Sequence, residues 1–426
     1  TPTRTEESNE CSRPSFNLRS VSPLAVLKNI DDMIIYPRHK LDIGLLDLAA
    51  GIFSYLIPLR KSKLEEEIVS FWNKKYVRVS FTVRTALDSM LTSLKLPSGS
   101  EVLMSAINIK DIVDIVESHG LNVVAIEFQY KDLTISGESV EKYITSNTKV
   151  LIFAQLFGAI VDLEPLYKVC KKHSILLIED CAQAFCGTEY HGSDFADISL
   201  FSFGPIKSST ALGGAIVIAR SEKHIIDSEA EERKYPAKTE IWYLKRVLKY
   251  SFLRGIQNIY IYSLLLFALK VLNLDLEKTI NGLARGFPKG DIVKQIQFQP
   301  PLHMLFLLRR RLKNNCKENF RLRRDSSNEF VKKLGPSFII PGKEAEYNSF
   351  WVLPVLSNNP KALQIKMMKN GFDSTRGSHA QIAICNEPNA ECFLDRVLYL
   401  PSVTHLKRKD VARLVLLLKA DKEEIT

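Results

Sequence analysis

The chain has 426 residues, of which 46% are apolar and 25% are charged, a composition typical of globular rather than disordered proteins. This length allows roughly two or three domains with substantial cores. The formal net charge of +10 favours anionic partners such as phosphorylated substrates or membrane surfaces. Neither a zinc-finger spacing nor an aromatic RNA-binding motif accompanies this charge, so we expect no nucleic-acid partner and no metal site.

The seven cysteines are scattered and have no CxxC spacing, which predicts reduced thiols in a cytoplasmic protein. The first residues also lack the order of charged, apolar and small residues that marks a signal peptide. We therefore expect a cytoplasmic location, with contact to a membrane surface as a second interpretation.

The first 75 residues are irregular, and their apolar run at 48–59 predicts a segment that packs on the domain that follows. Residues 76–220 alternate strands with helices, which predicts an α/β domain built on a mostly parallel sheet with helices on its faces. Ligands bind such sheets at the carboxyl ends of the strands. The expected strands are 76–82, 101–105, 122–127, 149–155, 175–179, 198–203 and 215–219, and the expected helices are 110–119, 139–145, 163–173 and one that begins near Leu87.

Two further regions follow this domain. Residues 221–330 are helical and basic, and we interpret them as an insertion or interdomain region. Residues 331–426 predict a small C-terminal α+β domain. Its expected elements are a strand at 350–356, a helix at 361–370, a strand at 397–400 and a helix at 409–419.

Residues 255–269 form an apolar stretch of fifteen uncharged residues bracketed by lysines and arginines. As a helix this stretch would rise about 22 Å, which is less than the roughly 30 Å of a hydrocarbon layer. We therefore predict a peripheral, non-spanning helix. Its apolar side would be covered either by protein or by a lipid surface.

Asp180 and Lys207 each follow an apolar strand. Taken singly, an aspartate there is usually a turn or cap residue, and a lysine usually faces solvent. An aldehyde cofactor, however, needs a lysine amine for a Schiff base and a carboxylate that keeps its pyridine nitrogen protonated. The pair therefore indicates a site for pyridoxal 5'-phosphate (PLP).

Neighbouring polar residues extend this interpretation. Ser202 precedes Lys207 by five residues, so one loop could place a hydroxyl on the cofactor phosphate and an amine on its aldehyde. Thr85 and Ala86 are expected between a strand and a helix, where backbone N–H groups and the helix dipole favour phosphate. Gln183 follows Asp180 by three residues and could bond the ring hydroxyl.

Five motifs carry a family resemblance, and it covers roughly residues 76–220. Their order and spacing resemble the DegT/DnrJ/StrS family of PLP-dependent sugar aminotransferases. The resemblance implies the type I fold of aspartate aminotransferase and a homodimer whose active sites lie at the subunit interface. The motifs are Val83-Arg84-Thr85-Ala86-Leu87, Pro97-Ser98-Gly99-Ser100-Glu101-Val102, Glu179-Asp180-Cys181-Ala182-Gln183-Ala184, Phe201-Ser202-Phe203-Gly204-Pro205-Ile206-Lys207 and Leu212-Gly213-Gly214.

The resemblance also implies roles for individual residues. Lys207 would carry the Schiff base, Asp180 would pair with the pyridine nitrogen, and Gln183 would contact the ring hydroxyl. The phosphate would be held by Thr85, Ala86 and Ser202. The segment 105–109, where the family usually places an aromatic residue that stacks on the cofactor ring, offers Asn108. The family's partner-subunit motif is not legible, and residues 294–301 stand where we would expect it.

The activity implied is transfer of an amino group from an amino acid, by family habit glutamate, to a keto sugar carried on a nucleotide. Retention of Lys207 favours transamination over the dehydration that some relatives catalyse with a histidine at this position. Two alternatives stay open at this point. One is a membrane-surface PLP enzyme with a lipid-linked acceptor, and the other is an inactive scaffold protein with the PLP fold.

Overall fold

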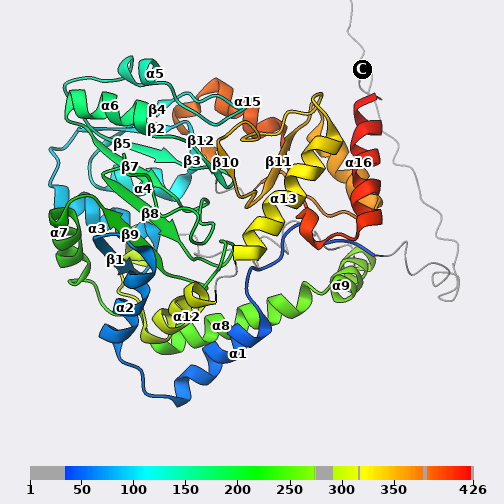
Figure 1. Cartoon of the computed structure of the whole chain (residues 1–426), viewed down its shortest axis with the longest axis horizontal. Coiled ribbons are helices and arrows are strands. Elements are labelled where there is room, and N and C mark those ends of the chain that lie inside the picture. Colours follow the sequence, from blue (N-terminus) through cyan, green and yellow to red (C-terminus); the bar gives the residue numbers. More distant parts are fainter. Residues whose placement is uncertain (1–33, 273, 275–290, 315–316, 378–380, 424–426) are drawn as a thin grey trace, which may run out of the picture.

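The computed structural model describes residues 34–272, 274, 291–314, 317–377 and 381–423, and its centre is a seven-stranded sheet (Figure 1). The strand order is β1-β9-β8-β7-β5-β2-β4. β9 runs antiparallel to β1 and β8, and the strands from β8 to β4 are parallel to one another. All seven expected strands are present, which confirms the predicted α/β fold class. Their bounds are β1 (Tyr76–Ser80), β2 (Glu101–Ser105), β4 (Asn122–Ile126), β5 (Thr148–Ala154), β7 (Leu176–Asp180), β8 (Ile198–Ser202) and β9 (Ala215–Ala219).

The central strands are continuous apolar runs because both faces of the sheet are covered. Leu103, Ile152 and Ile178 are buried at the middle of this core. The helices that connect these strands are α3 (Val83–Leu94), α4 (Lys110–Ser118), α5 (Gly137–Glu141) and α6 (Glu164–His173), and α7 (Glu222–Glu232) follows β9.

Helix α3 begins at Val83, four residues before the expected start near Leu87. The reason is a side-chain cap: the Thr82 hydroxyl accepts the Thr85 N–H at 3.1 Å. Thr85 and Ala86 therefore lie inside the first turn of the helix rather than in the loop before it.

Helices outside the sheet form a layer along one side, where α1, α8 and α12 pack together (Figure 1). The expected helix at 255–269 does not exist as one element. It is split by a bend of 89° between α8 and α9, and the Asn258 side chain caps α9 by accepting the Tyr260 N–H at 3.0 Å. The helices of this region are α1 (Leu45–Phe53), α2 (Lys61–Val69), α8 (Glu240–Ile256), α9 (Ile259–Val271), α11 (Ile292–Ile296) and α12 (Leu302–Lys313).

Within the described residues, no single helix has the length and apolar composition needed to cross a membrane. The bent pair α8 and α9 meets those two criteria only when its helices are taken together.

The C-terminal part is an α+β unit around the antiparallel pair β11 and β13, as predicted. Its first strand starts at Leu353 rather than at 350, because Phe350 has a left-handed backbone with φ of 47°. This unit joins the large domain through two short strand pairs, β12 with β3 and β10 with β6. The bounds are α13 (Lys317–Leu334), β11 (Leu353–Leu356), α14 (Pro360–Lys369), α15 (Pro388–Arg396), β13 (Val397–Leu400), α16 (Arg408–Glu423), β3 (Ile107–Ile109), β6 (Ala159–Ile160), β10 (Tyr347–Asn348) and β12 (Gln381–Ala383).

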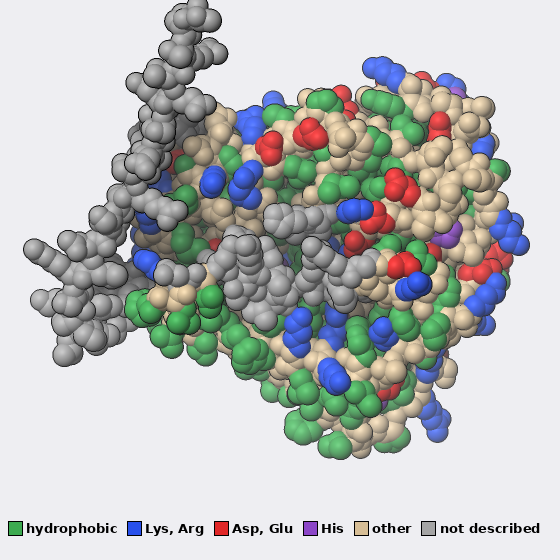
Figure 2. Space-filling model, turned by 180° about the vertical axis from the view of Figure 1, so that it is seen from behind, with side chains coloured by type: hydrophobic (Ala, Val, Ile, Leu, Met, Phe, Trp, Pro, Cys, Tyr) green, Lys and Arg blue, Asp and Glu red, His purple; other side chains and the backbone are tan. Residues whose placement is uncertain are grey.

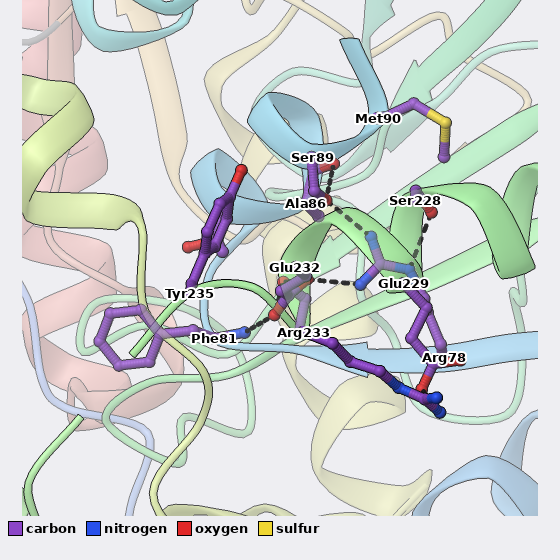
Figure 3. A network of polar contacts seen from close by, with 12 residues as sticks. Arg78, Phe81, Ala86, Ser89, Met90, Ser228, Glu229, Glu232, Arg233 and Tyr235 are labelled. Carbon is purple, nitrogen blue, oxygen red and sulfur yellow. Dashed lines mark hydrogen bonds and ion pairs between the residues drawn. The ribbon is translucent and has the colours of Figure 1, made fainter. Parts of the chain in front are cut away.

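A buried ion pair ties β1 to the helices on its face (Figure 3). Arg78 of β1 lies 2.5 Å from Glu232 at the end of α7, and both side chains are almost fully buried. Arg78 also donates to Ser89 of α3 at 3.0 Å. Glu232 in turn accepts the Phe81 N–H at 3.2 Å. The network thereby fixes the chain just before Thr82, where α3 begins.

We expect Arg78→Met to lower the free energy of unfolding by about 3–5 kcal/mol, because Glu232 would stay buried without its cation. Urea unfolding followed by circular dichroism measures this loss. Adding Glu232→Leu to that variant removes both charges, and the double variant should lose less stability than the sum of the single changes. An unchanged urea midpoint in the single variant would contradict a stabilising pair.

Candidate active site

The predicted site residues converge at one edge of the sheet. Strands β1, β7 and β8 run in the same direction, so their carboxyl ends lie at the same edge. Asp180 is the last residue of β7, Lys207 follows β8, and the first turn of α3 follows β1. The sheet thus gathers segments that lie about a hundred residues apart in the sequence.

The loop that follows β8 brings Ser202 and Lys207 together. The Lys207 N–H donates to the Gly204 carbonyl at 3.0 Å, which closes a tight turn. A methyl group at Gly204 would lie 3.7 Å from Ser202 Oγ and 3.9 Å from Lys207 Cγ. The two side chains therefore border the same small space, as the sequence interpretation expects.

Burial lowers the pKa of Lys207 from its ordinary value to about 8. The negative charge of Asp180 opposes this effect, and the positive charge of Arg84 adds to it. The ammonium group also lies 4.5 Å from the centre of the Trp351 ring, whose indole N–H donates to the Ile206 carbonyl at 3.0 Å. An amine with this pKa is partly neutral near pH 7, and the neutral form is the nucleophile.

Asp180 and its neighbour Glu179 have different surroundings. Glu179 is engaged inside the protein, since it accepts hydrogen bonds from Gln155 at 2.9 Å and Ser199 at 2.7 Å. Burial raises the pKa of Asp180, while the Ala182 N–H at 2.9 Å and the charges of Lys207 and Arg84 oppose that rise. Asp180 is therefore the carboxylate that faces the cationic groups of the site.

The groups of Thr85 and Ala86 that were expected to hold phosphate are engaged within the protein. The Thr85 hydroxyl donates to the Ile296 carbonyl at 2.7 Å. The Ala86 N–H donates to the Thr82 carbonyl at 2.9 Å as part of α3. Both residues still border the site edge, but their donors already have partners.

Arg84 lies in the same helical turn and is a site residue that the sequence interpretation missed. Its Nε lies 2.7 Å from an Asp111 oxygen, and its charge acts on the pKa of both Lys207 and Asp180. The sequence did contain a signal for Arg84, because this cation lies within the first motif and beside a helix N-terminus that favours anions.

Gln183 and Asn108 each have one part of the amide engaged. The Gln183 oxygen accepts the Phe157 N–H at 2.8 Å, so its NH2 group is the part that can donate to a ligand. Asn108 is buried, and its oxygen accepts the Ile109 N–H at 2.8 Å. Its Nδ2 atom has no hydrogen-bond partner among the described residues.

A second polar group borders Lys207 from other segments of the chain. Burial lowers the pKa of His39 to about 4; Asp42 opposes this effect, and the charges of Arg323 and Lys207 add to it. Arg323 donates to the Ser349 carbonyl at 2.8 Å. His39 Nε2 is also buried without a partner in the described part of the chain. No motif in the sequence pointed to these residues.

These observations fit PLP. The buried Asn108 Nδ2 and His39 Nε2 atoms have no hydrogen-bond partner among the described residues, so both are available to a ligand. A lysine with a lowered pKa and a buried aspartate supply the two groups that the aldehyde and the pyridine nitrogen require. The cations Arg84 and Arg323 suit the anionic parts of a cofactor or substrate.

Comparison with known proteins agrees with this chemistry. Residues 59–228 match the DegT/DnrJ/EryC1/StrS aminotransferase family, which confirms the resemblance predicted from the motifs. A GDP-perosamine synthase from Vibrio cholerae is 29% identical over 163 residues, which are 38% of this chain and 44% of that protein. The chain thus matches less than half the length of this relative.

Solved structures extend the likeness to the fold of almost the whole chain. The aminotransferase TlmJ from Streptoalloteichus hindustanus superposes with a TM-score of 0.67 at 14% identity, covering 92% of this chain and 100% of TlmJ. PseC from Helicobacter pylori is an aminotransferase involved in the biosynthesis of pseudoaminic acid. It superposes with a TM-score of 0.66 at 17% identity, covering 90% of this chain and 98% of PseC. The architecture is therefore that of the type I aminotransferases.

The lowered pKa of Lys207 gives a test that needs no cofactor. Labelling of Lys207 by acetic anhydride, followed by peptide mass spectrometry, should rise with a midpoint near pH 8, whereas an ordinary lysine titrates near 10.4. Asp180→Asn should lower this midpoint, because the carboxylate raises the pKa of Lys207, and Arg84→Gln should raise it. A midpoint near 10.4 in all three proteins would contradict the described burial.

Proposed function

We propose that this protein is a PLP-dependent aminotransferase that moves an amino group from an amino acid, by preference glutamate, to a keto sugar carried on a nucleotide. The observation that carries the proposal is the position of Lys207 and Asp180 at or beyond adjacent strand ends, where the charge of Asp180 acts on the pKa of Lys207. The family match over residues 59–228 supports it.

When bound, PLP supplies an aldehyde and a ring that accepts electrons. Lys207 holds the aldehyde end, and its amine exchanges protons near neutral pH because its pKa is about 8. Asp180 holds a proton on the ring nitrogen, and the NH2 groups of Gln183 and Asn108 donate to ring substituents. Trp351, which already lies against Lys207, supplies the aromatic surface that the segment 105–109 lacks.

For the cofactor phosphate we propose Arg84, Ser202 and the N-terminus of α3. Arg84 compensates for Thr85 and Ala86, whose donors are engaged elsewhere. An arginine in the first turn adds a full charge to the partial positive charge of the helix end. A dianion placed there would balance the excess of cations around Asp180.

For the acceptor we propose a sugar linked to a nucleoside diphosphate. The name of the Vibrio cholerae relative gives a GDP-linked product, and Arg323 offers a cation beside Lys207 on the side of His39. We also propose a cytoplasmic homodimer, because the partner-subunit contribution implied by the family resemblance would complete the pocket.

Lys207→Ala should abolish turnover and remove the near-visible absorbance of the bound cofactor, because the variant lacks the amine that would form the covalent bond. In the assay, the cofactor-loaded protein is mixed with glutamate and candidate nucleotide-linked keto sugars. The absorbance of the bound cofactor is then followed over time. Lys245→Ala, at an exposed lysine of α8, is the matched control and should behave as wild type. Equal absorbance and turnover in the Lys207 variant would remove Lys207 from this role, whereas wild-type protein that binds no cofactor and shows no turnover would leave the scaffold interpretation.

Asp180→Asn should retain the fold and bind the cofactor but lower kcat by orders of magnitude, since a neutral amide does not hold the ring nitrogen protonated. Cofactor content is measured by absorbance after denaturation, so that loss of binding and loss of turnover are separated. Full activity at full occupancy would remove Asp180 from this role.

A further inference from the structure

One side of the molecule carries a continuous row of exposed apolar side chains, here called the apolar surface. Helix α1, the following turn η3 (Ser54–Leu56), α8 and α9 contribute to it, and α8 contacts both α1 and α9. These helices lie along the lower edge of the molecule in Figure 1, and the view from behind in Figure 2 shows hydrophobic side chains gathered there. Its exposed members are Leu45, Leu46, Phe53, Leu56, Ile57, Leu248, Phe252, Tyr260, Ile261, Leu264, Phe267 and Val271.

Helices α8 and α9 are apolar on two sides. The inward side of α8 buries Tyr243, Val247 and Tyr250 against the core. A helix on a water-exposed surface normally presents polar residues on its other side. Instead Phe252 is 67% exposed and Leu264 is 65% exposed. Core packing of the described residues therefore does not explain why this apolar area is exposed.

Within residues 241–271, which include α9 and all of α8 except Glu240, the charges have one sign. Residues 241–271 contain five lysines and arginines and no aspartate or glutamate. Lys245, Lys249 and Lys270 are exposed on the same two helices. On α1 the acidic residue Asp47 is buried and paired with Arg310 and Arg311. The apolar surface thus has basic residues beside it on α8 and α9.

We propose that the apolar surface docks on an anionic lipid bilayer without crossing it. An apolar face with basic neighbours and a tyrosine at its edge is the combination that binds membrane interfaces. The bend of 89° between α8 and α9 breaks the run that, within the described residues, would be long enough to span, so the helices lie in the interface instead. This places the 255–269 segment on lipid, one of the two interpretations that its sequence allowed.

A second copy of the chain suits this surface less well. A twofold interface brings the same patch of both subunits together, so its basic residues would face one another. The stretch 241–271 supplies no acidic residue to pair with them. Anionic headgroups provide the missing negative charge, with about 1 kcal/mol of attraction for each basic residue near the membrane.

The test is flotation of the full chain with vesicles of phosphatidylcholine alone or mixed with phosphatidylglycerol. Wild type should float with the mixed vesicles and bind less to the neutral ones. Phe252→Ser combined with Leu264→Ser should weaken binding at least about tenfold, because two apolar side chains no longer enter the lipid. Leu416→Ser on α16 is the matched control, since Leu416 is 68% exposed outside the apolar surface, and it should bind as wild type.

A charge variant provides an independent arm that leaves the apolar side chains in place. Lys245→Glu combined with Lys249→Glu should weaken binding to the mixed vesicles about tenfold or more, and added salt should weaken wild type in the same direction. Circular dichroism confirms that each variant is folded, and ultracentrifugation gives its oligomeric state. Wild type that floats with neither vesicle, or serine variants that change a dimer to a monomer while lipid binding is absent, would overturn the proposal.

Discussion

The site depends on the electrostatic balance between two desolvated groups, Asp180 and Lys207. Burial raises the pKa of the carboxyl and lowers that of the amine, and each charge partly restores the other. Asp180 pairs with Leu200 of β8 in the register of the sheet, and Lys207 follows that strand. The direction and register of two adjacent parallel strands therefore set the chemistry, because a shift of one residue would turn Asp180 to the opposite face.

Arg84 adds a second cation beside Asp180 and Lys207, so the site has an excess of positive charge. It lowers the pKa of Lys207 and also opposes the rise in the pKa of Asp180. The buried Arg78–Glu232 pair holds the end of β1, and so holds the helix turn that carries Arg84. An ion pair outside the candidate site thus positions a cation that acts on the pKa values of Lys207 and Asp180. An anionic ligand would relieve the repulsion between Arg84 and Lys207.

The sequence predicted the parts of the fold that depend on local pattern. The central strands were recognisable because apolar runs buried on both faces have few polar interruptions. Asp180, Ser202 and Lys207 were placed correctly at the strand ends, because parallel strands share a direction. The helix start at Val83 was missed because the Thr82 cap was not recognised, and the break before Ile259 was missed because Asn258 was counted only as uncharged.

The remaining site residues depend on packing between distant segments, which one sequence does not reveal. Trp351 reaches Lys207 because Phe350 has a left-handed backbone and the segment pairs with the large domain through β10. His39 comes from an N-terminal segment without a motif, and Arg323 from a helix of the C-terminal unit. Local propensity contains no information on such contacts. Their role becomes visible only when burial and charge are known together.

Helix α8 connects the site to the apolar surface. On its inner side, Tyr243 donates to the Ala211 carbonyl at 2.7 Å, and Arg246 donates to the Leu212 carbonyl at 2.5 Å, just beyond the Lys207 loop. Arg254 donates to the Ile43 carbonyl at 3.0 Å, next to Asp42. One helix therefore supports both chain segments that border Lys207, while its outer side presents Phe252 to the surroundings. A bilayer that covers the outer side of α8 would contact the same helix that holds the loops of the site. Docking at the apolar surface would therefore also fix the orientation of the site relative to the bilayer.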